Sequence, residues 1–227
     1  MKNYNFAGVR SENYTIDPKE LTNAQWKYVN AVYGSAGDAS VTFDGVLNGE
    51  DLAVTYTYDG SADHPVDVGS YLVVATIGKA DYCAPGGGRT AETKYTVTKA
   101  TLIVTANAAT AVYGTEINDI VWNGYIVSGW EYDDEAKKLL TAYTPEYTAA
   151  GYAAGNANGS VDTYDISVSL PGASLDNYDI KYVIREDGFT VTKRSVAIGI
   201  VYQRTTYGDP LKELTWHILD RDDFYTV

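Results

Sequence analysis

Residues 95–114, with the sequence YTVTKATLIVTANAATAVYG, decide the fold because they occur almost three times in this 227-residue chain. A first copy covers residues 14–34 (YTIDPKELTNAQWKYVNAVYG), and a last copy covers residues 189–208 (FTVTKRSVAIGIVYQRTTYG). Each copy combines two strand-like runs with a short charged link, which is typical of two consecutive β-strands. Each copy therefore predicts the passage from one β-module into the next.

The spacing of recurrent landmarks indicates an internal repeat. The step from Tyr95 to Tyr113 is 18 positions, and the step from Phe189 to Tyr207 is also 18. The two full periods are 80 and 94 residues, and 13 additional residues before Tyr164 account for nearly all of the difference. Insertions of this kind are tolerated in the loops of a repeated scaffold. The clearest landmarks are the Tyr-Gly pairs Tyr33-Gly34, Tyr113-Gly114 and Tyr207-Gly208.

These landmarks divide the chain into four parts. They predict a terminal hairpin of a preceding repeat at 1–16, a first module at 17–99, a second module at 100–193 and the partial start of a third at 194–227. The second module carries an insertion at 131–160, in which residues 133–141 are the only expected helix. Strands are expected at 26–32, 41–46, 52–58, 69–77 and 94–98, then at 102–106, 120–127, 164–170, 178–183 and 189–192, and finally at 196–202 and 211–219.

Composition and charge disfavour several classes of protein. Tyr and Gly are abundant, and a hydrophobic fraction of 45% argues against disorder. The net charge of −13 disfavours binding to nucleic acid or to anionic lipid. Cys83 is the single cysteine, so we expect neither an intramolecular disulfide nor a cysteine-based zinc site. No stretch approaches the roughly 18 apolar residues of a membrane span.

The order of the landmarks resembles a known repeat family. Val-Tyr-Gly, then Gly-Ser-Tyr or Asp-Thr-Tyr, then Asn-Tyr, then Phe-Thr-Val-Thr-Lys is similar to the MBG repeats (YGX type) of large bacterial surface proteins. Residues 54–82 (VTYTYDGSADHPVDVGSYLVVATIGKADY) also resemble the related YDG repeats. The resemblance implies an extracellular, tandem all-β stalk or adhesin segment without catalytic residues. The insertion at 131–160 and the Asp17-Pro18 link depart from the family pattern.

Few residues suggest catalysis, and we expect no catalytic residue, cofactor or metal. His64 and His217 lack neighbours at ligand spacing, and we interpret His64 as a loop residue. The glycines at 86–88 are expected at a hairpin tip, where Gly8 and Gly188 occur in the other copies, rather than in a phosphate-binding loop. Acidic groups at 59–67, 131–135 and 220–223 are interpreted as solvated loops, because none matches a calcium-binding loop.

Aromatic residues crowd the insertion and offer the one candidate ligand surface. Exposed aromatic rings stack on sugars and anchor protein partners. The alternative is that these rings pack beneath the loop, because large aromatic side chains are mostly buried. If the chain has a ligand surface, the residues expected to form it are Trp130, Tyr132, Tyr143, Tyr147 and Tyr152.

Together, these patterns predict an all-β fold of tandem Ig-like or β-grasp-like sandwich modules in an elongated array. The expected function is a non-catalytic spacer or stalk in a large extracellular bacterial surface protein, attached to the cell surface or wall by an anchor outside this stretch. The alternative is an adhesin module that binds a host glycan or protein through residues 131–160. The expected partners are neighbouring repeats, and the half-modules at both ends also suggest head-to-tail self-association. Lysines recur at the module junctions, where we expect no isopeptide cross-link, at Lys19, Lys99 and Lys193.

Overall fold

A computed structural model describes residues 15–35, 37–132, 136–152 and 160–219. These residues form mainly strands, with one short α-helix and one 3₁₀ turn among them, so the prediction of an all-β fold is confirmed. They fall into two compact units. Unit 1 contains Met1–Leu102, Gly129–Lys138 and Ser174–Ile180, and unit 2 contains Ile103–Ser128, Leu139–Ala173 and Lys181–Val227. Residues 1–14 of the predicted terminal hairpin lie outside the described residues.

The first repeat, residues 17–99, forms one larger sheet and two strand pairs. Its strands are β1 (Lys19–Glu20), β2 (Thr22–Lys27), β3 (Asn30–Val32), β4 (Ser40–Asp44), β5 (Thr55–Tyr58), β6 (Gly69–Thr76), β7 (Tyr82–Cys83) and β8 (Thr90–Thr98). The larger sheet has the order β3-β8-β6-β5, in which β3 is parallel to β8 and the other pairs are antiparallel. β2 pairs antiparallel with β4, and β1 pairs in parallel with β7.

The core of the first repeat lies between these layers. Along β6, Val73 and Ala75 are fully buried whereas Leu72 is exposed, as expected for a strand with one face toward the core. One apolar cluster joins β4 to the end of β6, so the smaller strand pair packs on the larger sheet. Burial of this apolar surface is the main stabilising contribution, at roughly 25 cal/mol per Å². The cluster consists of Leu21, Val41, Phe43, Leu52, Ala75, Ile77, Tyr82 and Ala84.

The second repeat, residues 100–193, has the same arrangement of strands. Its elements are β9 (Ala100–Ala106), β10 (Ala109–Val112), the 3₁₀ turn η1 (Ile117–Asp119), β11 (Tyr125–Ser128), α1 (Ala136–Leu140), β12 (Glu146–Ala149), β13 (Thr163–Ser169), β14 (Tyr178–Val183) and β15 (Arg185–Thr192). The larger sheet has the order β10-β15-β13-β12, and the smaller sheet has the order β11-β9-β14.

The strand register is also the same in both repeats. Val32 pairs with Thr98 in the first repeat, as Val112 pairs with Thr192 in the second. The Thr98 hydroxyl donates to the carbonyl of the residue before Val32 at 3.1 Å, and the Thr192 hydroxyl donates to the carbonyl of the residue before Val112 at 3.2 Å. One sandwich pattern is therefore folded twice.

The insertion contributes regular structure to the second repeat. Helix α1 lies within the predicted helix, whose first residues, 133–135, are outside the described residues. Strand β12 was not predicted, yet it pairs with β13 and takes the edge position that β5 has in the first repeat. The strand predicted at 120–127 begins only at Tyr125, because η1 and the left-handed Gly124 (φ +79°) precede it.

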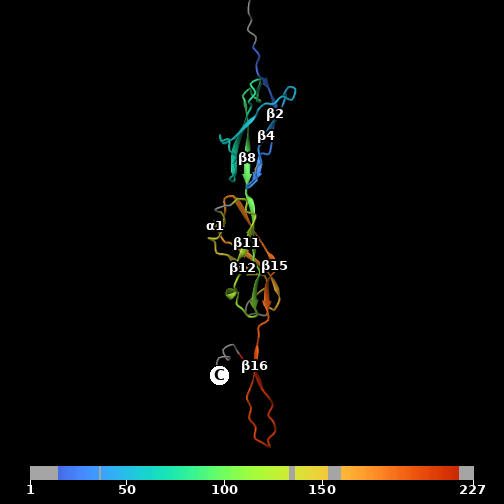
Figure 1. The fold of residues 1–227 in the computed structure, drawn as a ribbon, viewed down its shortest axis with the longest axis vertical. Helices are drawn as coiled ribbons and strands as arrows, with labels where there is room; N and C mark the ends of the chain where they lie inside the picture. Colours follow the sequence, from blue (N-terminus) through green and yellow to red (C-terminus); the bar gives the residue numbers. More distant parts are fainter. Residues whose placement is uncertain (1–14, 36, 133–135, 153–159, 220–227) are drawn as a thin grey trace, which may run out of the picture. The chain divides into compact units, whose positions relative to one another are not determined.

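The third part of the chain forms a two-stranded hairpin. β16 (Ala197–Ile200) pairs antiparallel with β17 (Trp216–Leu219), and both strands are shorter than predicted. In Figure 1, this part of the chain is drawn in orange to red, where β16 is labelled. Among the described residues, no helix has the length and apolar character that crossing a membrane requires.

The prediction that Gly188 lies at a hairpin tip in the second repeat is wrong. Gly188 lies within β15 and is buried, and a Cβ there would collide with the Ile166 side chain. The preceding residue, Asp187, has φ +51°, and the β13-β15 register shifts here, so this segment is a β-bulge. Gly86 and Gly87 do lie in an exposed turn between β7 and β8, and both have positive φ.

Candidate functional site

The five aromatic residues predicted to form a ligand surface fall into two groups. Trp130 and Tyr132 belong to unit 1, whereas Tyr143, Tyr147 and Tyr152 belong to unit 2. The predicted set is therefore not a single cluster within either unit.

In unit 1, four residues form what we call the aromatic cluster: Tyr33, Trp130, Tyr132 and Tyr178. The Tyr33 ring lies edge-to-face with the rings of Tyr132 and Tyr178, at centroid distances of 5.1 Å in both cases. The Trp130 and Tyr178 centroids are 5.4 Å apart. Such pairs contribute roughly 0.5–1.5 kcal/mol each beyond their buried area. Tyr33 and Tyr178 are buried, whereas Tyr132 remains 44% exposed.

Polar side chains in unit 1 join residues that are far apart in the sequence. The side-chain oxygen of Asn177 accepts the N–H of Val68 at 3.0 Å, and its amide donates to the Asp67 carboxylate at 3.0 Å. The Lys99 ammonium donates to the Leu175 carbonyl at 2.9 Å. The Lys99 bond fixes the residue between β8 and β9 against the segment that precedes β14, and the Asn177 bonds fix the loop before β6 against the same segment.

In unit 2, the remaining aromatic residues pack around Phe189 and Trp122. Tyr147 stacks on Trp122 with a centroid distance of 5.2 Å, and Tyr152 contacts Phe189 at 5.0 Å. Burial raises the pKa of both Tyr147 and Tyr152, because it disfavours the phenolate. Tyr152 is a core residue, so the structure does not support its prediction as a surface contact. Tyr143 is half-buried in the turn after α1.

The Tyr-Gly landmarks form one recurring turn, but their rings differ in exposure. Each glycine has a positive φ, which favours glycine. The ring of Tyr33 is buried, that of Tyr113 is 47% exposed, and that of Tyr207 is fully exposed. The aromatic cluster, and not the turn, is therefore what buries Tyr33. In each turn the N–H after the glycine donates to the carbonyl before the tyrosine, as in Ser35 to Val32 at 2.8 Å, Thr115 to Val112 at 3.0 Å and Asp209 to Thr206 at 3.0 Å.

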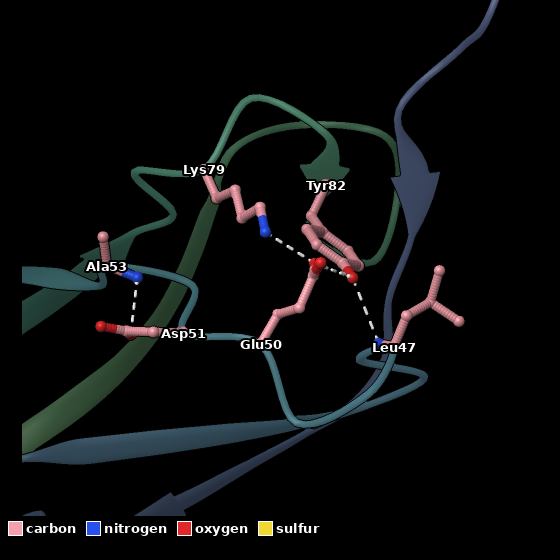
Figure 2. A network of polar contacts seen from close by, with 6 residues as sticks. All are labelled: Leu47, Glu50, Asp51, Ala53, Lys79 and Tyr82. Atoms are coloured by element: carbon pink, nitrogen blue, oxygen red, sulfur yellow. Dashed lines mark hydrogen bonds and ion pairs between the residues drawn. The ribbon is translucent and has the colours of Figure 1, made fainter.

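A polar network closes one end of the first repeat. Figure 2 shows the Glu50 carboxylate between the Lys79 ammonium and the Tyr82 hydroxyl, each at 2.7 Å. The hydrogen bond from Lys79 is the main reason that the pKa of Glu50 is lowered, and the bond to Glu50 raises the pKa of Lys79 and of Tyr82. The Tyr82 hydroxyl also accepts the N–H of Leu47 at 3.1 Å. The charges in this network are paired, so it acts as a brace for two loops.

The second repeat uses its equivalent tyrosine in the same way. The hydroxyl of Tyr178 accepts the N–H of Glu131 at 3.2 Å, as Tyr82 does from Leu47. In both repeats, a glycine with φ near +94° lies two residues before the bonded N–H, and these glycines are Gly45 (φ +93°) and Gly129 (φ +95°). Sequence reasoning missed these loop glycines and Glu50, although the glycine spacing was a usable signal.

The two histidines lie in different surroundings. The ring nitrogens of His64 lie 2.9 and 3.0 Å from the carbonyl oxygens of Gly37 and Pro65, in the loop position that was predicted. His217 lies in the exposed β17. The described residues hold no group of three or more His, Cys, Asp or Glu side chains that could bind a metal ion. Predicted acidic groups at 133–135 and 220–223 lie outside those residues.

Comparison with known proteins gives one assignment. A family model described as the MBG domain matches residues 27–101, from the end of β2 to the beginning of β9. A search of curated proteins found no significant match. The match covers the sheet β3-β8-β6-β5 and the network around Glu50.

Proposed function

We propose that this chain, whose residues 27–101 match the model of the MBG domain, is a non-catalytic structural spacer within a large extracellular bacterial surface protein. In this role the repeats hold another part of the protein at a distance from the cell surface. The recurring sandwich pattern and the resemblance of nearly the whole chain to MBG repeats support this proposal.

The observation that carries the proposal is the set of polar contacts at Lys99 and Asn177 in unit 1. A single residue, Lys99, separates the last strand of the first repeat from the first strand of the second. Its ammonium is bound to the Leu175 carbonyl, and Asn177 is bound to Asp67 and Val68. A spacer needs junctions that resist bending, and a short link fixed by side-chain hydrogen bonds provides such resistance.

Stretching the whole chain by force spectroscopy tests the spacer proposal. We expect two unfolding events that each release about 30 nm, because each repeat has roughly 80 to 95 residues at about 3.5 Å per extended residue. Asn177→Ala should lower the force of one event, because it removes the bonds to Asp67 and Val68. Asn118→Ala in the exposed turn η1 is the matched control and should leave both forces unchanged. A chain that extends without force peaks would contradict the proposal.

A second candidate function, ligand binding, is favoured by one observation. Tyr132 is 44% exposed beside Trp130, and the Lys137 ammonium lies 6.0 Å from the Trp130 ring centroid. Exposed aromatic rings near a cation suit the face of a sugar or a protein partner. On a glycan array, the adhesin alternative predicts binding that Tyr132→Ala abolishes and Tyr28→Ala preserves, since Tyr28 is 68% exposed elsewhere in unit 1. No binding by the parent chain would favour the spacer.

A further inference from the structure

The β16-β17 hairpin presents one apolar face to solvent. Ile198 pairs with Ile218, and Ile200 pairs with Trp216, so these four side chains share a face. Each is at least 60% exposed, and Val196 at the entrance to β16 is equally exposed. Isolated two-stranded hairpins are marginally stable in water, so a hairpin with this composition needs a covering layer.

The equivalent positions in the second repeat are buried. The repeat spacing aligns Val196, Ile198 and Ile200 with Leu102, Val104 and Ala106 of β9, and all three of these have no exposed surface. The strand pairing agrees with this alignment. Val104 is opposite Val127 and Ala106 is opposite Tyr125 in the second repeat. In the hairpin, Ile198 is opposite Ile218 and Ile200 is opposite Trp216. The two strand pairs therefore have the same register, but the apolar face is covered in the second repeat and exposed in the β16-β17 hairpin.

The first repeat identifies what covers such a face. There, Val41 and Phe43 of β4 belong to one core with Ala75 and Ile77, which lie in and just after the central strand β6. The covering layer is thus the apolar side of a four-stranded mixed sheet.

The segment between β16 and β17 also lacks its usual partner. Residues 203–206 align with β10, which in the second repeat pairs in parallel with β15. No strand is present at 203–206, although the turn at Tyr207-Gly208 is formed as in the other repeats. The exposed apolar face and the missing strand at 203–206 have one cause. The sheet that covers the hairpin would also contain the strand that pairs with 203–206.

We propose that the apolar face of the β16-β17 hairpin binds the four-stranded sheet of a further MBG-type repeat, formed by polypeptide equivalent to residues 129–193. The bound sheet would cover Ile198, Ile200 and Trp216 and pair with residues 203–206. A second copy of this chain does not offer such a sheet, since β3-β8-β6-β5 and β10-β15-β13-β12 already belong to their own sandwiches. This inference depends on the repeat equivalence and not on the spacer role.

Cysteine labelling in two versions of the chain tests the inference. One version is the chain as it is, and the other carries a second copy of residues 129–193 directly after Leu219, which aligns with Ser128. Ile198→Cys is introduced in both, in a Cys83→Ala background. We expect alkylation of Ile198→Cys to be at least about tenfold slower in the extended chain, because labelling then requires local opening.

Ala197→Cys is the matched control. It lies next to Ile198 on the opposite face and aligns with Ile103, which is 40% exposed in the second repeat. Its labelling rate should change less than about twofold between the two versions. Hydrogen exchange of the added copy provides a second measurement, and protection of its strands is expected.

Three results would overturn the inference. The first is equal labelling of Ile198→Cys in both versions, and the second is an added copy whose amides exchange as fast as in an unfolded chain. The third is a dimer of the unextended chain in light scattering that Ile198→Asp converts to a monomer, because the hairpin would then bind a second hairpin.

Discussion

At the scale of single residues, hydroxyl groups of buried tyrosines hold loops in place. Tyr95 donates to the carbonyl of Gly37 at 2.8 Å, and its ring packs against Tyr58 and His64 with centroid distances of 5.3 and 5.0 Å. Burial is the main reason that the pKa of Tyr95 is raised. In the second repeat, the equivalent position is Phe189, which keeps the ring without the hydroxyl.

Tyr95→Phe is therefore expected to preserve the fold and to weaken the first repeat modestly. The loss of the hydrogen bond to Gly37 should lower the free energy of unfolding by about 1 kcal/mol. Urea unfolding measures this difference. Tyr113→Phe is the control, because about half of Tyr113 is exposed, and it should change the value by less than about 0.5 kcal/mol. A Tyr95→Phe variant as stable as the parent would mean that water replaces the hydroxyl without cost.

The Glu50 network predicts a dependence of stability on acidity. The pKa of Glu50 is lowered in the folded chain, so its contribution is present above the pKa of an unfolded glutamate, about 4.3, and is lost as the pH falls through the folded value. Glu50→Gln should therefore reduce the loss of stability between neutral and acidic pH. Urea unfolding across this range provides the measurement, with Glu92→Gln on the exposed side of β8 as control.

The alkaline side has the opposite sign. The folded pKa values of Lys79 and Tyr82 are both raised, so their contribution is complete below the unfolded values near 10 and is lost as the pH rises through the folded values. Glu50→Gln should also reduce this alkaline loss. Identical acid and alkaline profiles for Glu50→Gln and the parent would contradict the brace inferred from Figure 2.

At the scale of elements, the loop after β11 requires glycine for two separable reasons. Gly129 has φ +95°, and a Cβ there would collide with the Thr101 carbonyl oxygen. Gly86 has φ +89° in the turn before β8, but a Cβ there meets nothing within 4 Å. The comparison isolates the effect of the close approach from that of the left-handed backbone.

Gly86→Ala should cost roughly 1–2 kcal/mol, the strain of an L-residue with positive φ. Gly129→Ala should cost about 1–3 kcal/mol more, because the added methyl group forces the loop and β9 apart. Thermal and urea unfolding of the two variants give both values. Equal costs would show that the loop moves freely away from Thr101.

At the scale of the whole molecule, each unit has its own core. Phe189 is fully buried in unit 2 among Tyr152, Tyr164 and Trp122, whereas Tyr95 is fully buried in unit 1. Phe189→Ala should destabilise unit 2 by about 3–5 kcal/mol, as expected for an aromatic ring removed from a core. Hydrogen exchange should then show lost protection in β13 and β15 with protection retained in β6 and β8.

Tyr95→Ala is the reciprocal variant and should leave β13 and β15 protected. Loss of protection in all four strands in both variants would mean that the two units unfold as one cooperative body. Separate losses agree with the approximately additive behaviour of repeat proteins, in which each repeat has its own stability.

Local patterns in the sequence were sufficient for the all-β class and for most strands, because alternation and turn residues depend on near neighbours. The Tyr-Gly spacing also located three turns, each of which has the equivalent backbone hydrogen bond. Strand β12 and the bulge at Gly188 could not be inferred, since both depend on a partner strand, β13, rather than on their own residues. For the candidate site, the sequence showed that aromatic residues crowd the insertion, but it could not show that Trp130 and Tyr132 fall in one unit and Tyr143, Tyr147 and Tyr152 in the other.

The sequence alone determined that one β-sandwich pattern is repeated, because side-chain periodicity and turn chemistry are written in consecutive residues. Only the tertiary structure decided which of the recurring aromatic residues are buried. Tyr33 is covered by Tyr132 and Tyr178, whereas Tyr113 remains exposed in an equivalent turn. The physical reason is that burial of a side chain depends on what packs against it from distant parts of the chain, and two identical turns can differ in that respect.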